Sequence, residues 1–398
     1  MQNVQANMIE QLFFELIQVA IGKRICLSHT PSADEWGKLY AMAKKQSLVG
    51  VCFVGVQKAS PQPSPEGKGE KSLLLRGDLE EAYIPEMLYF TWMGMAAKIQ
   101  QRNETVNRQC VELQKRLSAD GFRSYIMKGQ YVATLYGEHL AALRQSGDID
   151  VYLEGGLDKV LAYARTFGEV KKVNELEMSV PVYEDSSTNS GQVTEVEFHY
   201  RPFIMRNPFK NAKLQKFFDD QSEACFTNRI SLENKAESLE IMAPTIVFNL
   251  VHQMVHTYHH FITEGVGLRQ LMDYYFVIQA SNADDVFECQ KMVESLGLNR
   301  FASALMWVLM HVFGLKVEQA LWAPCEKDGL LLLDEILMSG NFGHTDERAK
   351  DIQTSRWKAF WFVNGKTFRF WRFDHWAWFW SPVWRAYHFC WRKSRGFK

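Results

Sequence analysis

The stretch that decides the fold is Met127-Lys-Gly-Gln-Tyr-Val-Ala-Thr-Leu-Tyr-Gly-Glu-His-Leu-Ala-Ala-Leu-Arg-Gln-Ser-Gly-Asp-Ile-Asp150. Asp148 and Asp150 lead into Val151-Tyr152-Leu153, a sequence that favours a strand. Alternate residues of a strand project from one face, so the two carboxylates stand about 6.5–7 Å apart. Like charges side by side are unfavourable, and a divalent cation removes that cost. Because Mg²⁺ prefers one or two carboxylates with phosphate oxygens and water, the pair predicts metal-assisted attack on a nucleoside triphosphate.

A phosphate-binding corner is predicted just before these carboxylates. Phe122 to Met127 is expected to form a strand, Lys128-Gly129 a tight turn, and Gln130 to Tyr136 a short helix. Backbone N–H groups at such a helix start suit a phosphate, and the glycine allows close approach. Lys128 adds a positive charge, so we expect this corner to hold phosphate oxygens.

A third carboxylate is expected on a neighbouring strand. In residues 192–200, apolar and polar side chains alternate, which places Glu195, Glu197 and His199 on one face. Glu197 is the expected third metal ligand, and Glu195 is the competing choice. His199 is expected either to line the site, as a base or as a group that orients a ligand, or to be a half-buried structural histidine.

The ordered set resembles the DNA polymerase β-like nucleotidyltransferase superfamily, and more narrowly its bacterial group of uncharacterised nucleotidyltransferases. The resemblance covers about residues 120–275 and is carried by Lys128-Gly129, Arg144-x-x-Gly147-Asp148-x-Asp150, Glu197-x-His199 and Gly265–Asp273. Two features depart from the wider pattern. Lys-Gly replaces the superfamily's usual Gly-Ser, and Glu197 stands where the narrow group typically has Asp, one methylene shorter.

The resemblance implies an α+β fold and transfer of a nucleoside monophosphate from an NTP such as ATP to a hydroxyl-bearing acceptor, with release of pyrophosphate. It implies Mg²⁺ or Mn²⁺ as cofactor. The implied catalytic and metal-binding residues are Asp148, Asp150 and Glu197. The implied nucleotide-binding residues are Lys128, Gly129, Arg144 and Gly147. For Arg144, the alternative of a surface arginine that supports the loop is equally open.

Two further segments are candidates for lining the cleft. The helical stretch 251–260 carries histidines at 252, 256, 259 and 260, and we expect His256 or His259 to face the cleft. Zinc is a weaker alternative, because no H-E-x-x-H pattern and no nearby cysteine accompany them. Arg269 lies four residues before Asp273, which favours an ion pair that supports the helix. The alternative is that Arg269 contacts the nucleotide.

The predicted architecture is a small mixed-sheet core between helical segments. Residues 1–120 are expected to be helical, with a flexible insert at about 59–78 that begins with three prolines and two glycines. Residues 121–205 are the predicted α/β core, with a helix at 157–167 and further strands at 169–173, 176–182 and 192–200. Residues 206–350 are the predicted helical domain, followed by a tail at 351–398.

The tail differs in composition from the rest of the chain. Residues 356–398 carry ten Lys or Arg, one acid and eight tryptophans, whereas the whole chain has a net charge of −1. Tryptophan with basic residues suits a peripheral membrane contact and, less favoured here, single-stranded nucleic acid. An equally open alternative is a helical layer that packs on the core.

Composition bounds the class of protein. Apolar residues at 47% and charged residues at 23% fit an ordinary globular protein. Seven dispersed cysteines without a C-x-x-C pair fit reduced thiols, and the N-terminus lacks a basic signal region, so a cytoplasmic or membrane-associated location is expected. The alternatives to an enzyme are an inactive nucleotide-binding module and a membrane-surface interaction protein. A small molecule or a protein is the favoured acceptor.

Overall fold

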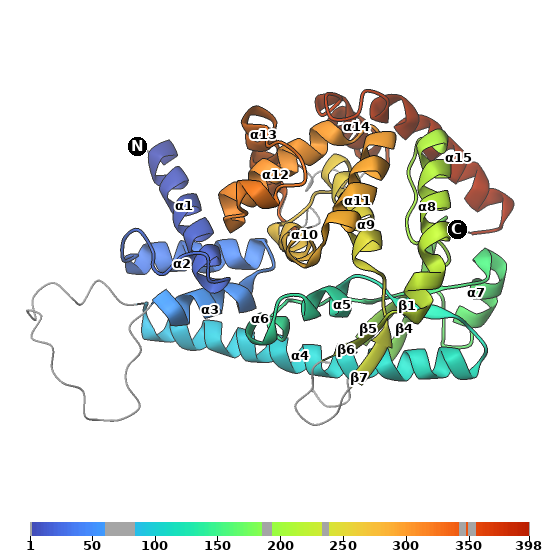
Figure 1. The fold of residues 1–398 in the computed structure, drawn as a ribbon, viewed down its shortest axis with the longest axis horizontal. Coiled ribbons are helices and arrows are strands. Elements are labelled where there is room, and N and C mark those ends of the chain that lie inside the picture. Colours follow the sequence, from blue (N-terminus) through green and yellow to red (C-terminus); the bar gives the residue numbers. More distant parts are fainter. Residues whose placement is uncertain are drawn as a thin grey trace, which may run out of the picture.

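The computed structural model describes residues 2–59, 84–184, 193–232, 239–341, 348 and 356–397. The chain adopts the predicted α+β fold, in which helical segments lie on both sides of a mixed five-stranded sheet (Figure 1). Most of the insert expected at about 59–78 and most of the polar turn expected at 184–191 lie outside the described residues.

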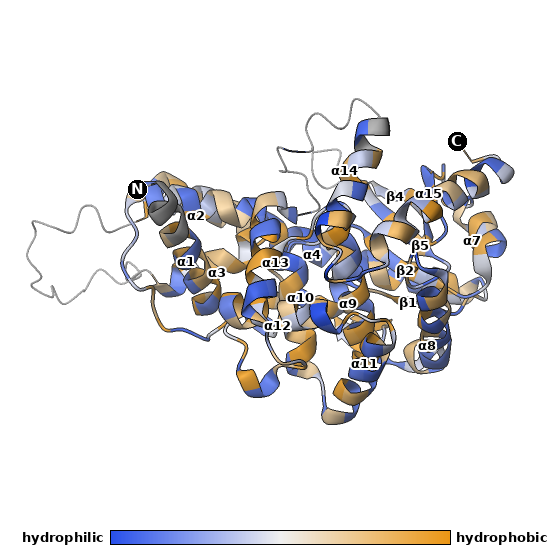
Figure 2. Ribbon diagram, turned by 90° about the horizontal axis from the view of Figure 1, so that it is seen from above, coloured by the Kyte–Doolittle hydropathy of each residue, from blue (hydrophilic) through white to orange (hydrophobic). Residues whose placement is uncertain are grey.

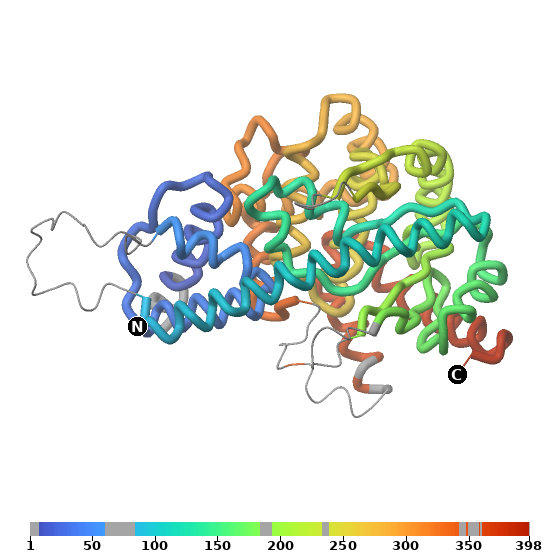
Figure 3. Tube along the Cα trace, turned by 90° about the horizontal axis from the view of Figure 1, so that it is seen from below, coloured from blue at the N-terminus to red at the C-terminus, as the bar shows by residue number. Residues whose placement is uncertain are grey.

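Four helices precede the sheet: α1 (Gln2–Ala20), α2 (Ala33–Lys45), α3 (Val49–Ala59) and α4 (Glu86–Ala119). Ser32 caps α2 as its sequence suggests, because its hydroxyl accepts from Glu35 N while Glu35 accepts from Ser32 N at 2.8 Å. Helix α4 runs along most of the molecule, from the N-terminal helices to the sheet (Figure 3). Its buried Asn103 donates 2.7 Å hydrogen bonds to the carbonyls of Ala142 and Arg144, which fixes the loop before Asp148.

The central sheet has the strand order β1-β2-β5-β4-β3, in which β2 and β5 are parallel and the other pairs are antiparallel. The strands are β1 (Ser124–Ile126), β2 (Ile149–Leu153), β3 (Lys172–Val173), β4 (Glu177–Glu184) and β5 (Val193–His199). The connecting helices are α5 (Gly129–Thr134), α6 (Glu138–Ala141) and α7 (Gly156–Ala164). All five predicted strands form, although β1 and β3 are shorter than expected. Ile149, Val151 and Leu153 of β2 and Val196 and Phe198 of β5 are buried on one face, which leaves Asp150, Glu195 and Glu197 on the other.

The C-terminal part is mainly helical, as expected, but a two-stranded sheet interrupts it. Strands β6 (Arg229–Leu232) and β7 (Leu239–Met242) pair antiparallel, because Leu232, Leu239 and Ile241 bury their side chains while alternate residues stay exposed. The helices are α8 (Pro208–Thr227), α9 (Ile246–Ile262), α10 (Leu268–Ala280), α11 (Ala283–Ser295), α12 (Asn299–Phe313), a 3₁₀ turn (Val317–Gln319), α13 (Glu326–Ser339), α14 (Arg356–Arg369) and α15 (Ala377–Ser394). Hydrophilic and hydrophobic residues alternate along α11 (Figure 2), as expected for a helix with one exposed face.

The Trp/Arg-rich tail packs on the helical part through its middle. Phe370 and Phe373 are buried against Phe261 of α9, with ring centroids 4.5 and 5.6 Å apart. Lys210 of α8 donates to Asp374 at 2.8 Å. This segment therefore forms part of the core, in agreement with the packed-layer alternative. Within the described helices, none combines the length and the apolar character that a membrane span requires.

Candidate functional site

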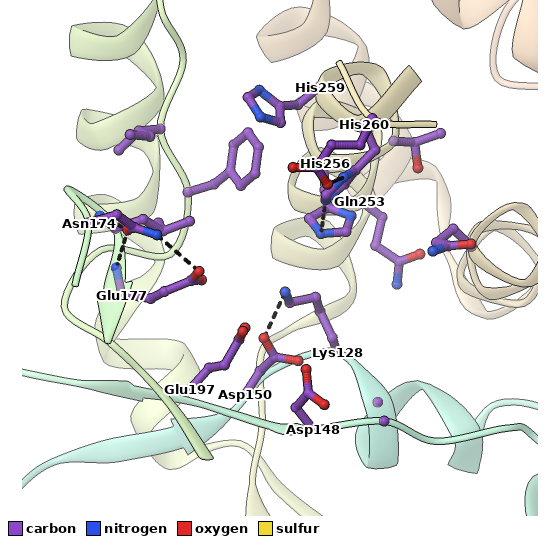
Figure 4. A pocket seen from close by; sticks show the side chains of 18 of the residues that line it. Lys128, Asp148, Asp150, Asn174, Glu177, Glu197, Gln253, His256, His259 and His260 are labelled. Atoms are coloured by element: carbon purple, nitrogen blue, oxygen red, sulfur yellow. Dashed lines mark hydrogen bonds and ion pairs between the residues drawn. The ribbon is translucent and has the colours of Figure 1, made fainter. Parts of the chain in front are cut away.

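A cavity of about 780 Å³ lies between the sheet, α9 and α15. The start of α5, the loop before β2, the turn between β3 and β4, and the N-terminal turn of α10 complete its walls. Figure 4 shows carboxylates from the strands on one side and histidines of α9 on the other. The sequence-predicted site residues line this cavity with three exceptions: His199 is buried directly behind the carboxylates, His252 lies deeper in α9, and Glu195 contacts other partners.

The parallel pairing of β2 and β5 brings the predicted acids together. Asp150 stands opposite Glu197 in the register, and the potential ligand atoms of Asp150, Glu197 and His199 lie within 4.8 Å of one another. In the described ranges this is the group of His, Cys, Asp and Glu side chains that could hold a metal ion, and the histidines of α9 form no such group. The geometry therefore offers a cation site at the strands and gives no support to zinc on α9.

Asp150 is the centre of this group. Lys128 Nζ donates to its Oδ1 at 2.7 Å, and His199 Nε2 donates to the same atom at 3.0 Å. Burial opposes ionisation of this carboxyl, but Lys128 and His199 hold its pKa well below the usual range. Burial likewise opposes protonation of His199, yet hydrogen bonds with Asp150 and Glu197 raise its pKa to about 9. His199 is fully buried rather than half-buried, and it acts on the site through the carboxylates.

Sequence reasoning missed one acid of this cluster, Glu177. Antiparallel pairing of β4 with β5 places Glu177 opposite His199, and His199 Nε2 lies 3.3 Å from Glu177 Oε2. Burial, together with Glu177 and Asp150, raises the pKa of Glu197 to about 7. The alternation of Glu177 with the buried Met178 indicates a strand with one polar face. Placing Glu177 at the site also requires knowing that β4 pairs with β5, which the sequence does not show.

Glu195, the competing choice for the third ligand, points to other partners. Lys171 donates to it at 2.9 Å and the Ser179 hydroxyl donates at 3.2 Å. Asp148 is exposed at the cavity rim beside Gly147. Partial desolvation of its carboxyl by the cavity walls, together with the charge of Asp150, raises its pKa. Asp148 lies next to Asp150 but outside the group of three (Figure 4).

The Lys128-Gly129 corner forms the predicted tight turn with an unusual backbone. Both residues have positive φ, 43° at Lys128 and 38° at Gly129, a region that side chains disfavour. Such strain in a non-glycine residue persists where surrounding contacts determine it, commonly at functional sites. Here the ion pair with Asp150 holds the lysine, so its ammonium already contacts the acidic group.

Arg144 has a structural partner that the sequence did not suggest. Its guanidinium donates two 2.7 Å hydrogen bonds to Asp273, which also accepts from the Tyr136 hydroxyl at 2.6 Å. Asp273 therefore faces the loop before β2, where Arg144 is its hydrogen-bonded partner, and its charge also acts on Arg269 of the same helix. Arg269 donates to the carbonyl of Gln145 at 2.7 Å and so holds the same loop.

The histidines of α9 are buried among aromatic rings and each other. His256 and His259 line the cavity as expected, and His256 Nε2 hydrogen-bonds His260 Nε2 at 3.1 Å. His252 lies deeper and donates to the carbonyl of Pro202 at 3.2 Å. Burial, reinforced by the positive charge of Lys128, lowers the pKa of His252 to about 3.

His252 is expected to make stability depend on pH. Because its folded pKa is about 3, the unfolded chain, with a pKa near 6.5, takes up the proton first. This contribution is complete above pH 6.5 and is lost as pH falls toward 3. When the pH falls from 7.5 to 5.5, the free energy of unfolding of His252→Gln should decrease by about 1.4 kcal/mol less than that of the wild type. Urea denaturation at the two pH values measures this difference. His139→Gln, at an exposed histidine, is the control and should behave like the wild type. If the free energy of unfolding of His252→Gln depended on pH as steeply as that of the wild type, the assignment would be refuted.

The tail supplies a cavity wall that sequence reasoning did not foresee. Trp384, His388 and Arg392 of α15 line the cavity, together with Phe203 and Arg206 from the segment after β5. The three α15 residues recur every four positions, which places them on one helix face. The four-residue spacing can be seen in the sequence. The sequence does not show that this face of the helix covers the cavity.

A comparison of the sequence with known proteins identifies the family of the chain. No curated protein sequence matches the chain. A solved structure, an antigenic nucleotidyltransferase-like protein from Paracoccidioides brasiliensis, matches at 12% identity and a TM-score of 0.32, over 56% of this chain and 94% of that one. The sequence model described as uncharacterised nucleotidyltransferase matches residues 32–314, which is more than half of the chain. The chain therefore belongs to the uncharacterised nucleotidyltransferase family.

Proposed function

We propose that the protein transfers a nucleoside monophosphate from an NTP to a hydroxyl-bearing acceptor and releases pyrophosphate, with Mg²⁺ or Mn²⁺ as cofactor. The observation that carries this proposal is the convergence of Asp150, Glu197 and His199 beside the Lys128-Gly129 corner on one cavity wall. The same arrangement motivates the wider assignment to the DNA polymerase β-like superfamily.

The donor set fits a divalent metal ion. Asp150, Glu177 and Glu197 converge in one cluster beside Lys128 and His199, and burial together with the charges of Glu177 and Asp150 raises the pKa of Glu197 to about 7. Carboxylate oxygens are the ligands that Mg²⁺ and Mn²⁺ favour. Asp150 and Glu197, with Asp148 at the rim, would hold the ion. When bound, it would neutralise phosphate charge and lower the pKa of the acceptor hydroxyl.

The chain's own residues account for positioning and proton transfer. Lys128 supplies a buried positive charge at the turn where Gly129 leaves room for a phosphate. Glu197, which lies opposite Asp150 on the cavity wall, is the carboxylate placed to accept the acceptor's proton. The acceptor oxygen bonds to the α-phosphorus as the bond to the bridging oxygen breaks and pyrophosphate leaves. His199 orients Asp150 through its 3.0 Å hydrogen bond.

Binding of nucleotide is the first test. With NTP at a hundred times its dissociation constant, the free energy of unfolding should rise by about 2.7 kcal/mol. Thermal melts with each NTP, with and without Mg²⁺ or Mn²⁺, should show a metal-dependent shift that is reduced in Asp148→Asn. No shift with any NTP would count against the proposal, whereas a shift without pyrophosphate release in the presence of candidate acceptors would favour an inactive nucleotide-binding module.

A membrane-surface contact is a second candidate function, because the tail exposes large aromatic side chains. Trp361 is 67% exposed and Phe389 is 62% exposed, and further exposed residues follow in α15 and before it: Trp371, Trp376, Trp378, Phe379 and Tyr387. With the basic excess of residues 356–398, this surface suits an anionic bilayer.

Vesicle binding tests this second function. The protein should sediment with phosphatidylserine-containing vesicles but not with neutral ones. Replacing Trp361, Trp376 and Phe389 by Ser should reduce binding about tenfold or more. Exposed apolar residues on other helices provide the control, Phe209 and Phe287 replaced by Ser. Equal sedimentation of the two variants would contradict a membrane role for the tail.

A further inference from the structure

One end of the cavity is built from basic and aromatic side chains that the proposed chemistry does not use. Its residues, here called the basic wall, are Phe203, Arg206, His259, Trp384, His388 and Arg392. They come from the segment after β5, from α9 and from α15. Figure 4 shows His259 across the pocket from Asp148. The cavity therefore joins an acidic end to a basic end.

Arg206 is a partly buried cation that has no carboxylate within ion-pair distance among the described residues, although the charge of Glu264, which lines the same cavity, acts on it from farther away. Its Nη1 donates to the Ser381 hydroxyl at 2.7 Å, and its guanidinium lies 5.2 Å from the centroid of the Trp384 ring. Its Nε is enclosed and meets no acceptor among the same residues. Because the enclosed Nε cannot reach the cavity, the terminal nitrogens of this guanidinium are the donors that remain for a ligand.

An uncompensated guanidinium at such a position is costly. Burying a charge without a partner destabilises the fold unless a counter-ion is supplied. Burial and the nearby Arg385 together lower the pKa of Arg206 to about 10, which still leaves it charged at neutral pH. An anion bound from solution would supply the missing partner, and an arginine can pair two oxygens of a phosphate or a carboxylate.

The face of α15 adds a second cation and a flat apolar surface. Arg392 lines the cavity on the same helix face as Trp384 and His388, whose rings stack at 4.9 Å. In the described part of the chain no carboxylate lies within ion-pair distance of Arg392 either. The acids near this end, Glu175 and Glu264, are already bound by His388 and His260. The basic wall thus offers two guanidinium groups beside an indole ring.

We propose that the basic wall is the acceptor subsite, and that the acceptor is a small molecule carrying an anionic group, a phosphomonoester or a carboxylate, bound by Arg206 and Arg392. This inference rests on the proposed function, with the NTP at the Lys128-Gly129 end. An apolar part of the acceptor lies along the edge of Trp384, whose ring contacts Arg206 and stacks on His388, and the acceptor's hydroxyl faces Glu197. The cavity of about 780 Å³ is within the range of pockets that enclose ligands of drug size.

Titration calorimetry with the full chain tests the subsite. The protein is saturated with a non-hydrolysable ATP analogue and Mg²⁺, and phenyl phosphate or benzoate is then added. At least one probe should bind the wild type, and the probe that binds more tightly identifies the anionic group as phosphate or carboxylate. Arg206→Gln should weaken that binding by at least about tenfold. Arg201→Gln, at an exposed arginine of the same segment, should leave it unchanged.

The outcomes separate this inference from the proposed function. If neither probe binds the wild type while the nucleotide analogue does, the acceptor subsite is refuted and nucleotidyl transfer is not. If Arg206→Gln weakens the analogue by the same factor as the probe, Arg206 binds the triphosphate and the acceptor assignment is overturned. If the analogue fails to bind, the probes are titrated without it, and probe binding that depends on Arg206 then establishes the anion site alone.

A second variant guards against misfolding of Arg206→Gln. Arg392 lies near the end of α15 and is only partly buried, so Arg392→Gln should melt like the wild type. It should still weaken the bound probe about fivefold or more, as expected for loss of one charge-assisted pair. Unchanged probe affinity in Arg392→Gln, together with unchanged affinity in a folded Arg206→Gln, would overturn the proposal.

Discussion

Replacing Asp150 by Asn is expected to reduce kcat for nucleotidyl transfer by at least about 10³-fold, equivalent to ~4 kcal/mol of transition-state stabilisation. The reason is geometric: Asp150 lies opposite Glu197, accepts from Lys128 and His199, and belongs to the group that could hold a cation. Asn keeps the size but loses the charge and one ligand oxygen. Release of pyrophosphate from the NTP identified by the melts is the measurement.

A matched variant separates the site from the strand that carries it. Glu195→Gln changes a carboxylate two residues from Glu197 that pairs with Lys171 and Ser179, and it should stay within about twofold of the wild type. Glu197→Gln should behave like Asp150→Asn, because it removes the proposed base. Circular dichroism should show that each variant is folded. Normal turnover by Asp150→Asn would refute the mechanism.

Replacing Arg144 by Met is expected to destabilise the fold by about 3–5 kcal/mol, because it leaves the buried Asp273 without its counter-charge. Both side chains are at most about one tenth exposed, so solvent cannot substitute for the partner. Urea denaturation measures the effect. Arg229→Ala, which breaks an exposed pair with Glu240, should change stability by less than about 1 kcal/mol.

A double variant identifies the cause of that loss. Arg144→Met with Asp273→Asn removes both charges yet keeps an oxygen that accepts from Tyr136, so it should recover most of the stability lost in Arg144→Met. If Arg144→Met instead melts like the wild type and only weakens NTP binding, the arginine is a phosphate ligand and its structural role is wrong.

The sequence predicted the α+β fold and the elements that carry the acids because both depend on local alternation. In β2 and β5 apolar residues alternate with polar ones, and parallel pairing then brings Asp150 beside Glu197. The pairing of Arg144 with Asp273 joins residues 129 positions apart on a loop and a helix. No local pattern encodes such a contact, so a neighbouring i,i+4 partner seemed the simpler choice for Asp273.

The cavity wall formed by α15 was unpredictable for a similar reason. The tail's composition indicated an amphipathic segment, which suits a bilayer, a nucleic acid or the core alike. The structure shows that one face of α15 lines the cavity through Trp384 and His388 while Phe379 and Tyr387 on the other side are exposed. The composition of the segment does not distinguish the residues of the cavity-lining face from those of the exposed face. Only the position of the helix in the fold shows which face lines the cavity.

The position of α15 also imposes an order on synthesis. The strands with Asp150 and Glu197 leave the ribosome long before Trp384 and Arg392, because they come earlier in the chain. Domains generally fold as units, from the N-terminal side, during translation. A nascent chain can thus assemble the acidic half of its cavity and the histidines of α9 before α15 exists. A chain cut short before α15 would lack Trp384, His388 and Arg392, which the proposed acceptor subsite needs to retain a second molecule.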